Sequence, residues 1–314
     1  MKSIINAAIV LAASLFFLLS CTSDADSSST TVVDTTTAAP KEWRIVSLNG
    51  TITELLHTFK LQDKIVGVDV TSTYPESVKS IANLGHTSQL NTEAILELKP
   101  NLILIDEKTV GNKALEGLEE AGIDIQVIQI PQTLDGSLKV AQQLGTLLDQ
   151  TIETEVLAKK IEQNTKKIND LVAKVTEKPK VLFIYARGAQ AMMVAGKNTF
   201  AEKMIELAGG IPVVQEFESF KPLTAEALLQ YQPEAILMFN SGLASLADEA
   251  KEQTGKEQLL AIPGVGQTPA GKNQKIITME GLYLSGFGPR SSDAALELAT
   301  ALHNNELTLL SEVE

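Results

Sequence analysis

Short apolar runs alternate with amphipathic segments along most of the 314-residue chain. The runs have the length of buried strands, and the segments between them carry apolar residues near helical spacing. Strands that alternate with helices are typical of a parallel sheet, because parallel neighbours need a crossover between them. Strands are predicted at 44–48, 65–68, 124–130 and 180–185, and helices at 52–59, 75–81, 111–121, 137–148 and 292–304.

One helix–strand element occurs twice. Its first copy is EAILELKPNLIL, Glu93 to Leu104, and its second copy is EALLQYQPEAIL, Glu226 to Leu237, 133 positions later. In each copy an amphipathic helix begins at an acidic residue, which suits the positive N-terminal end of a helix, and stops before a proline; an apolar strand follows. One copy in each half predicts two related α/β lobes that face each other across a cleft, where small ligands tend to bind.

A long segment between the two halves contains neither glycine nor proline. From Ile152 to Val175 its apolar residues lie near helical spacing, and a continuous helix of this length extends about 36 Å. A single helical link resists the wide hinge closure of many binding proteins. The predicted fold is therefore α/β: two similar lobes with mainly parallel sheets, residues 43–150 and 178–314, joined by one long helix within 151–177.

The first 21 residues are typical of a lipoprotein signal peptide. Lys2 precedes an apolar run, Ile4 to Leu19, that is too short and too near the start for a transmembrane helix. The run ends in a lipobox, LLSC, whose Cys21 is the only cysteine. We expect cleavage before Cys21 and lipidation of its thiol, which leaves the mature chain without a disulfide or a cysteine metal site; an uncleaved anchor is the alternative.

The residues after this cysteine form a predicted tether. Positions 22–42 are mostly Ser, Thr, Ala and Asp, with too few large apolar side chains to build a core. A flexible coil of this length spans roughly 25 Å on average, enough to hold a folded domain away from a bilayer. We therefore expect a location in the cell envelope, outside the cytoplasm, with membrane contact through the lipid anchor only.

Composition excludes several classes of function. The net charge is −13, with 39 acidic and 26 basic residues and no basic run, so a nucleic-acid partner is not expected. The sequence has no phosphate-binding glycine loop, no GxSxG, no cysteine nucleophile and no histidine beside a clear serine and carboxylate, so an enzyme is not expected either. Its three histidines are too scattered for a zinc or manganese site.

Five segments together resemble a known family: RIVSLNGTITELLHTF, DKIVGVDVTSTYPES, LGHTSQLNTEAILELKPNLIL, VAGKNTFAEKMIELAGG and GFGPR. They are similar to the haem-binding lipoproteins that serve bacterial ABC importers, within a broader class that also takes up cobalamin and ferric siderophores. The resemblance covers about Arg44 to Leu302. STYPES, the LG-x-x-x-x-L segment and GFGPR are specific for the haem branch, whereas the repeat supports only the broader class.

The resemblance implies a monomer that captures haem by axial ligation and delivers it to an ABC permease dimer with its ATPase. A ferric-siderophore or cobalamin binder of the same fold is the alternative. An aromatic content of only 4% argues mildly against a cleft with many aromatic walls.

His86 is the first candidate for an axial ligand of haem iron. It lies in LGHT, just ahead of the first repeat helix and hence on a loop at the cleft-facing end of a strand. The family usually has the iron-binding tyrosine here. Imidazole is also a good iron ligand and, unlike phenolate, does not strongly favour the ferric state; a solvated loop histidine is the alternative. His57 is expected to be packed or half-exposed on a helix, and His303 is expected at the surface.

A second axial ligand should come from the other lobe. The repeat offset maps His86 onto Ser219, beside Phe220, where the family often has a tyrosine; phenylalanine can stack on a porphyrin but cannot ligate iron. Met192 or Met193 is the favoured candidate, because a thioether is a competent sixth ligand and only one of two adjacent strand residues can point into the cleft. Core filling is the alternative. Lower-ranked candidates are Tyr74, Tyr185 and Tyr283.

Haem propionates call for cationic partners at the rim of the cleft. Arg187 follows a predicted strand, and Arg290 ends GFGPR immediately before a predicted helix N-cap, so both are candidates. A salt bridge to a carboxylate of the chain is the alternative for either arginine.

The duplicated glutamates have a role that the resemblance implies. In the wider class, glutamates that match Glu93 and Glu226 dock onto arginines of the two permease subunits, one lobe to each subunit. A pseudo-symmetric protein with one carboxylate per lobe suits a two-fold permease. The alternative, a favourable position at a helix N-terminus, is worth about 0.3–1 kcal/mol for each residue and is compatible with docking.

Overall fold

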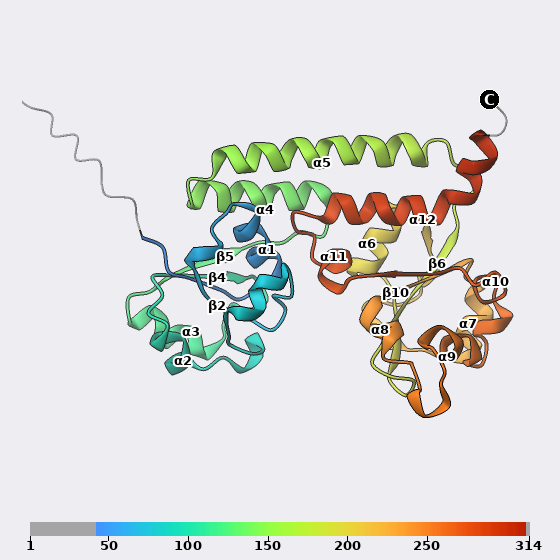
Figure 1. Cartoon of the computed structure of the whole chain (residues 1–314), viewed down its shortest axis with the longest axis horizontal. Coiled ribbons are helices and arrows are strands. Elements are labelled where there is room, and N and C mark those ends of the chain that lie inside the picture. Colours follow the sequence, from blue (N-terminus) through green and yellow to red (C-terminus); the bar gives the residue numbers. More distant parts are fainter. Residues whose placement is uncertain (1–41, 312–314) are drawn as a thin grey trace, which may run out of the picture. The chain divides into compact units, whose positions relative to one another are not determined.

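The first half of the chain builds a five-stranded sheet in which every neighbouring pair is parallel (Figure 1). The computed structural model describes residues 42–311, so the predicted signal peptide, Cys21 and the tether up to residue 41 lie outside the described residues. The strand order β3-β2-β1-β4-β5 places β1 in the centre. The strands are β1 (Ile45–Ser47), β2 (Ile65–Val68), β3 (Ala82–Asn83), β4 (Leu102–Asp106) and β5 (Asp124–Ile128).

Helices cover both sides of this sheet. Apolar residues of α1 and α4 pack on one side with Ile45 and Leu102, and those of α2 and α3 pack on the other side with Val46 and Ile103. This division follows from the two-residue period of a strand. The helices are α1 (Gly50–Thr58), α2 (Thr92–Glu97), α3 (Lys113–Glu120) and α4 (Leu134–Leu147), with 3-10 turns η1 (Gln62–Lys64), η2 (Glu76–Ser80) and η3 (Thr87–Gln89).

The helix predicted at 75–81 is a 3-10 turn, η2. Its turns close through i to i+3 bonds, from the Val78 N–H to the Pro75 carbonyl and from the Ile81 N–H to the Val78 carbonyl. A segment this short, which starts after a proline and leads directly into a strand, cannot propagate an α-helix.

The second half contains a six-stranded sheet in the order β11-β10-β6-β7-β9, with β8 paired to β6. Its β6, β10 and β11 are parallel, whereas β7 runs antiparallel to both β6 and β9, so this sheet is mixed. The strands are β6 (Lys180–Ala186), β7 (Met192–Ala195), β8 (Ile211–Pro212), β9 (Phe220–Pro222), β10 (Ala235–Phe239) and β11 (Ile276–Met279). The helices are α6 (Phe200–Leu207), α7 (Ala225–Tyr231), α8 (Asn240–Ala244), α9 (Gly255–Ala261), α10 (Pro269–Lys272), α11 (Gly281–Ser285) and α12 (Ser291–Ser311), with 3-10 turns η4 (Glu249–Lys251) and η5 (Val265–Gln267).

The repeated element has the same local geometry in both halves. Asn91 and Thr224, again 133 positions apart, are the N-caps of α2 and α7, and each side chain accepts a hydrogen bond from the backbone N–H three residues later. Lys99 and Gln232, which precede the two prolines, both adopt the left-handed conformation, with φ of 49° and 44°. The duplication therefore extends to caps and turns that the aligned letters alone do not share.

One long helix, α5 (Thr151–Val172), joins the two sheets and packs against α4 and α12 (Figure 1). Its Leu157, Ile161 and Ile168 belong to a single apolar core that also contains Leu102 of the first sheet and Leu237 of the second. A core that is continuous through both lobes restricts their relative motion. None of the helices in residues 42–311 combines the length and the apolar character that crossing a membrane requires.

Candidate functional site

The loops at the carboxyl ends of the two sheets line adjoining pockets. A pocket of about 260 Å³ lies between loops that follow β1, β4 and β5 of the first lobe and Leu282 and Gly286 of the second. A neighbouring pocket of about 420 Å³ is lined by Thr71 and Thr73 of the first lobe and by Asn240, among others, of the second. In the first sheet the strand order reverses between β1 and β4, and ligands of open α/β sheets bind outside the carboxyl ends at such a point.

Two larger pockets lie elsewhere. One, of about 870 Å³, lies at the opposite end of the second sheet, beside Lys180, Glu234 and Lys275. The other, of about 840 Å³, runs along α4 and α5. Neither receives loops from the carboxyl ends of both sheets, so the smaller pair of pockets marks the candidate cleft.

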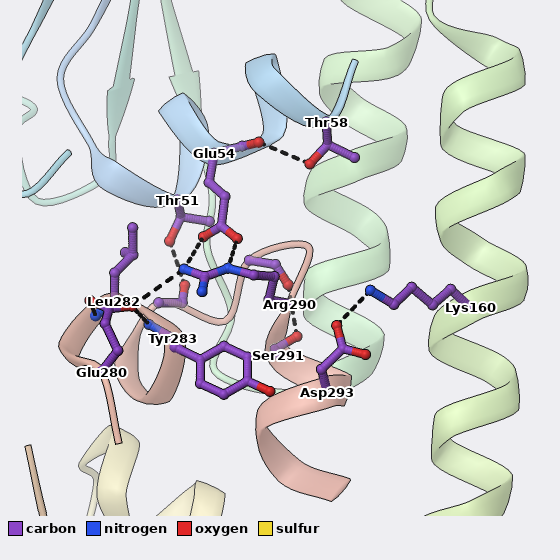
Figure 2. Close-up of polar contacts among 12 residues, drawn as sticks. Thr51, Glu54, Thr58, Lys160, Glu280, Leu282, Tyr283, Arg290, Ser291 and Asp293 are labelled. Carbon is purple, nitrogen blue, oxygen red and sulfur yellow. Dashed lines mark hydrogen bonds and ion pairs between the residues drawn. The ribbon is translucent and has the colours of Figure 1, made fainter. Parts of the chain in front are cut away.

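Arg290 connects the two lobes beside this cleft (Figure 2). Its Nε donates to Glu54 Oε1 of α1, and its Nη2 donates to Glu54 Oε2 at 3.4 Å and to Glu280 Oε2 at 3.3 Å. The guanidinium carbon also lies 3.6 Å from the centre of the Tyr74 ring and 4.9 Å from that of Tyr283. This is the salt bridge that the sequence allowed as the alternative to a propionate contact.

Burial governs the protonation of this pair. The Glu54 side chain is only 4% exposed. Its burial raises the pKa of the Glu54 carboxyl, and the hydrogen bond and charge of Arg290 offset only part of that effect. Burial by itself lowers the pKa of Arg290, but Glu54 and Glu280 outweigh it, so the pKa of Arg290 is raised and the guanidinium stays charged.

The GFGPR segment is held against the first lobe along its length. Thr51 Oγ1 donates to the Gly286 carbonyl at 2.6 Å, and Ser137 Oγ donates to the Phe287 carbonyl at 2.7 Å. A Cβ at Gly286 would lie 2.6 Å from the carbonyl oxygen of Leu282 in its own turn and 3.0 Å from Thr51 Oγ1 of the first lobe, so glycine is required here. The segment therefore positions Arg290 between the lobes.

His86 lies at the surface, on the loop that follows β3. The loop turns at Gly85, whose φ is +78°, and is fixed by hydrogen bonds from the Val70 N–H to the Gly85 carbonyl (2.9 Å) and from Asn112 Nδ2 to the Thr87 carbonyl (2.5 Å). His86 Nδ1 lies 3.1 Å from Ser88 Oγ. It also accepts a hydrogen bond from the Ser88 backbone N–H at 3.4 Å, so in the neutral ring the lone pair lies on Nδ1 and the proton on Nε2. Metal binding through Nε2 requires the proton to move to Nδ1, where Ser88 Oγ can accept it.

Exposed apolar side chains lie on the segments bonded to this loop. Val70 bonds to Gly85 through its backbone, Tyr74 lies further along the same loop, and Val110 lies two residues before Asn112; all three are exposed. We call Val70, Tyr74 and Val110 the apolar surface beside His86. Ser88, Val70 and Val110 were not among the residues predicted from the sequence, although apolar residues in a loop that directly follows a buried strand were a visible signal.

The two methionines point to opposite sides of the second sheet. Met192 pairs with Ala186 and packs in a core away from α5, whereas Met193 pairs with Tyr185. Cross-strand partners share one side of a sheet. The Tyr185 ring contacts those of Phe220 and Phe239, with centres 6.3 and 6.0 Å apart, within a cluster that also includes Phe183 and Phe200. The structure thus separates the two methionines, and only Met193 lies with the aromatic residues.

Two further candidates of the second lobe are Arg187 and Tyr283. Arg187 is exposed, donates from Nε to the Tyr185 hydroxyl at 2.6 Å and stacks on that ring. Burial and the nearby Glu297 raise the pKa of Tyr283, which disfavours the phenolate that iron would need.

Residues 45–281 match the model of a family described as periplasmic binding protein. The chain belongs to this family. A solved structure similar to the chain is the periplasmic heme-binding protein RhuT from Roseiflexus sp. RS-1 in its apo form, with 37% identity, a TM-score of 0.74, and coverage of 84% of this chain and 98% of that one. The two-lobed α/β fold predicted from the sequence is therefore confirmed.

Two curated relatives of this periplasmic binding protein differ in what their names say. One is the uncharacterized ABC transporter substrate-binding lipoprotein YvrC of Bacillus subtilis (strain 168), 24% identical, with coverage of 83% of this chain and 80% of the relative. The other is a cobalamin-binding protein of Halobacterium salinarum (strain ATCC 29341 / DSM 671 / R1), 23% identical, with coverage of 84% and 70%. These names describe transport components rather than enzymes, and they support the substrate-binding role of an ABC transporter.

None of the predicted haem-binding residues of this periplasmic binding protein lines either cleft pocket, and the remaining predicted residues lie away from these pockets as well. Glu93 and Glu226 are exposed in the first turns of α2 and α7. His57 is half-buried on α1, and its burial lowers its pKa. The prediction for His303 is wrong: it is only 2% exposed, with Nε2 3.0 Å from the Ala208 carbonyl oxygen. It continues the buried side of α12, which packs against both α5 and α6.

Proposed function

We propose that this periplasmic binding protein captures haem in the cleft between its lobes and delivers it to the permease dimer of an ABC importer. The observation that carries the proposal is the exposed His86 imidazole, held by Ser88 on a loop at the carboxyl end of the first sheet. When the ring proton lies on Nδ1, Ser88 Oγ can accept it and Nε2 can bind iron, and such outer hydrogen bonds orient metal-binding histidines. The printed name of the Roseiflexus relative supports the same cargo.

The apolar surface beside His86 supports a macrocycle as the ligand. Val70 and Val110 are exposed on segments bonded to the His86 loop, and Tyr74 is exposed beside Arg290, so a porphyrin bound to His86 could cover apolar area here. Covering these side chains removes apolar area from water, at roughly 25 cal/mol per Å². Phe220 of the aromatic cluster is the proposed wall on the second lobe, and Tyr283 ranks below it.

Met193 is the proposed second axial ligand, since it alone of the methionine pair lies on the Tyr185 side of the sheet. A thioether opposite an imidazole raises the reduction potential of haem iron. Tyr185 is the rival donor, because it occupies the neighbouring position on the same side.

Arg187 is the proposed partner of a propionate. Its guanidinium is exposed and uses Nε on Tyr185, so other donors remain for a carboxylate. A propionate at Arg290 would have to compete with Glu54 and Glu280, which already accept its hydrogen bonds. We therefore assign Arg290 first to the connection between the lobes.

Delivery and anchoring complete the proposal. Glu93 and Glu226 are exposed, one in each lobe, as docking onto two permease subunits requires. Cys21 is the proposed lipidation site; lipid labelling of wild type and of Cys21→Ala tests it, because labelling of the variant would exclude this residue.

Cobalamin is the second candidate cargo, favoured by the name of the Halobacterium relative. Parallel titrations of the purified chain with hemin and with cyanocobalamin separate the two. The haem proposal predicts a saturable Soret band with hemin and no retention of cyanocobalamin after equilibrium dialysis. Retention of cyanocobalamin without a hemin complex would overturn it.

A further inference from the structure

The two copies of the repeat share six identical positions. One of these, Ala94 and Ala227, is half-buried in both copies, and the other five fall into two groups. Pro100, Ile103 and Leu104, like their counterparts in the second copy, are buried, so the core accounts for their identity. Two identical positions are exposed in both copies. They are the glutamate, Glu93 and Glu226, and the leucine three residues later, Leu96 and Leu229.

The exposure of the leucines does not follow from poor packing of the helices. Ile95 of α2 and Leu228 of α7, which precede them, are fully buried, whereas Leu96 and Leu229 are 37% and 43% exposed. A single exposed leucine is ordinary on a protein surface. The other position that is exposed in both copies has diverged, from Glu97 to Gln230. The fold therefore does not explain why the same exposed leucine occurs at the same position of both copies.

The leucine and the glutamate of each copy lie together. Residues three apart on a helix are neighbours on its surface, with Cβ atoms about 5–6 Å apart. Each lobe therefore presents an acidic and an apolar side chain as one unit. Neither carboxylate takes part in an ion pair within the described part of the chain.

Both units lie on the same side of the molecule. Ile95 packs in the core beneath the first sheet and Leu228 in the core beneath the second, and each of these cores is separate from the continuous core that contains α5. Figure 1 shows α2 and α7 on the sides of the sheets turned away from α5. A single partner can reach both units from that side.

We propose that Leu96 and Leu229 are apolar anchors for the permease, each inserted beside a basic side chain that receives Glu93 or Glu226. The inference rests on the docking role in the proposed function and adds the chemistry of the partner surface: one basic and one apolar group on each subunit, repeated by the two-fold axis. An apolar contact surrounded by charge excludes water from the ion pair and strengthens it.

The test uses the full-length chain and its permease–ATPase complex in lipid nanodiscs. Leu96→Ala and Leu229→Ala should each raise the protein concentration that half-maximally stimulates ATP hydrolysis by about fivefold, because each loses the contact of one to two buried methylene groups. The double variant should be weaker still, and Leu→Met at both positions should restore stimulation. Hemin spectra should not change in any of these variants.

The matched control is Ile152→Ala, which shortens another exposed apolar side chain, 74% exposed, at the start of α5. It should leave stimulation unchanged. Normal stimulation by the double leucine variant, together with loss of stimulation in Glu93→Gln/Glu226→Gln, would overturn the leucine proposal and leave the glutamate role standing. If the wild-type protein does not bind hemin but the leucine variants still dock more weakly to the permease, only the proposal that haem is the cargo is rejected. The wild-type protein could instead form a dimer that the leucine substitutions dissociate without any change in ATPase stimulation. In that case the partner of the leucines would be a second copy of this chain, and the proposal would be overturned.

Discussion

Arg290, which directly precedes the last helix, is paired with Glu54, which lies 236 positions earlier on the first helix, and their contact joins the two lobes beside the cleft. The carboxylate is almost fully buried, and it can remain there only with a cation as partner. The pair therefore contributes to holding the two sheets at a fixed separation, together with the shared core and α5.

Arg290→Ala should destabilise the protein strongly. It leaves Glu54 buried without its cation, which typically costs about 3–5 kcal/mol. Urea unfolding measures the loss in free energy of unfolding. The control is Lys79→Ala, which removes an exposed partner of Glu76 and should have little effect. Equal stabilities of Arg290→Ala and Lys79→Ala would contradict the role given to this pair.

The stability of the protein should carry a pH dependence from Glu54. Because burial raises its pKa in the folded state, the folded protein binds a proton more readily than the unfolded chain. The contribution of Glu54 to the free energy of unfolding is thus greatest below about pH 4.3, the ordinary pKa of glutamate. It declines as pH rises through the raised pKa of the folded state. Unfolding of wild type and Glu54→Gln across this window should show a slope in wild type that the variant lacks. If the contribution of Glu54 to the free energy of unfolding instead grows as pH rises, the sign is the opposite of the prediction. Such a result would show that Arg290 affects the pKa of Glu54 more strongly than burial does.

The two methionines should differ in what their replacement changes. Met193→Ala should convert a six-coordinate low-spin ferrous spectrum into a five-coordinate one. Met192→Ala removes a half-buried side chain that packs against the core and should instead lower the free energy of unfolding, by up to about 2 kcal/mol, while leaving the spectrum as it is. Spectra that neither substitution alters would remove Met193 and leave Tyr185, or a solvent molecule, on the second side of the iron.

Docking should depend on both duplicated glutamates and capture on neither. Glu93→Gln and Glu226→Gln keep the size and helical position of the side chain but remove its charge. Each should reduce transporter-stimulated ATP hydrolysis while hemin binding stays within about twofold of wild type, because both lie outside the cleft pockets. Normal stimulation by the double variant would exclude the docking role.

The general fold could be predicted from the sequence because its signals are local. The apolar strands, the glycine-free linking segment and the repeated prolines each specify their own structure within a few residues. Met192 and Met193 were expected in a strand, but the antiparallel direction of β7 was not predicted, and β9 was missed, because strands of four and three residues have too few positions to show an alternating pattern.

The site depended on contacts between distant residues, and those were harder to predict. The sequence indicated that Arg290 is a cation beside the start of a helix. It did not indicate that Arg290 pairs with Glu54, which is buried in the other lobe. His303, near the end of the described chain, was placed at the surface because its neighbours are polar, yet packing of α12 on two other helices buries it. Ser88, which lies two residues after His86, could have been predicted from the sequence, because histidines that bind metals usually have an outer hydrogen-bond partner.

The most direct measurement for haem capture is a hemin titration of wild type, Ser88→Ala and His86→Ala, followed by Soret absorbance, with the unfolding midpoint of each protein as a control for folding. The account predicts a saturable, shifted Soret band in wild type. Ser88→Ala should weaken hemin affinity by about tenfold without abolishing the band, as loss of an outer hydrogen bond does at other metal sites. His86→Ala should lose the shifted band, and added imidazole should restore part of it. A wild-type spectrum and affinity that persist in a folded His86→Ala variant would contradict His86 as the ligand, and no saturable hemin binding by wild type would contradict haem capture itself.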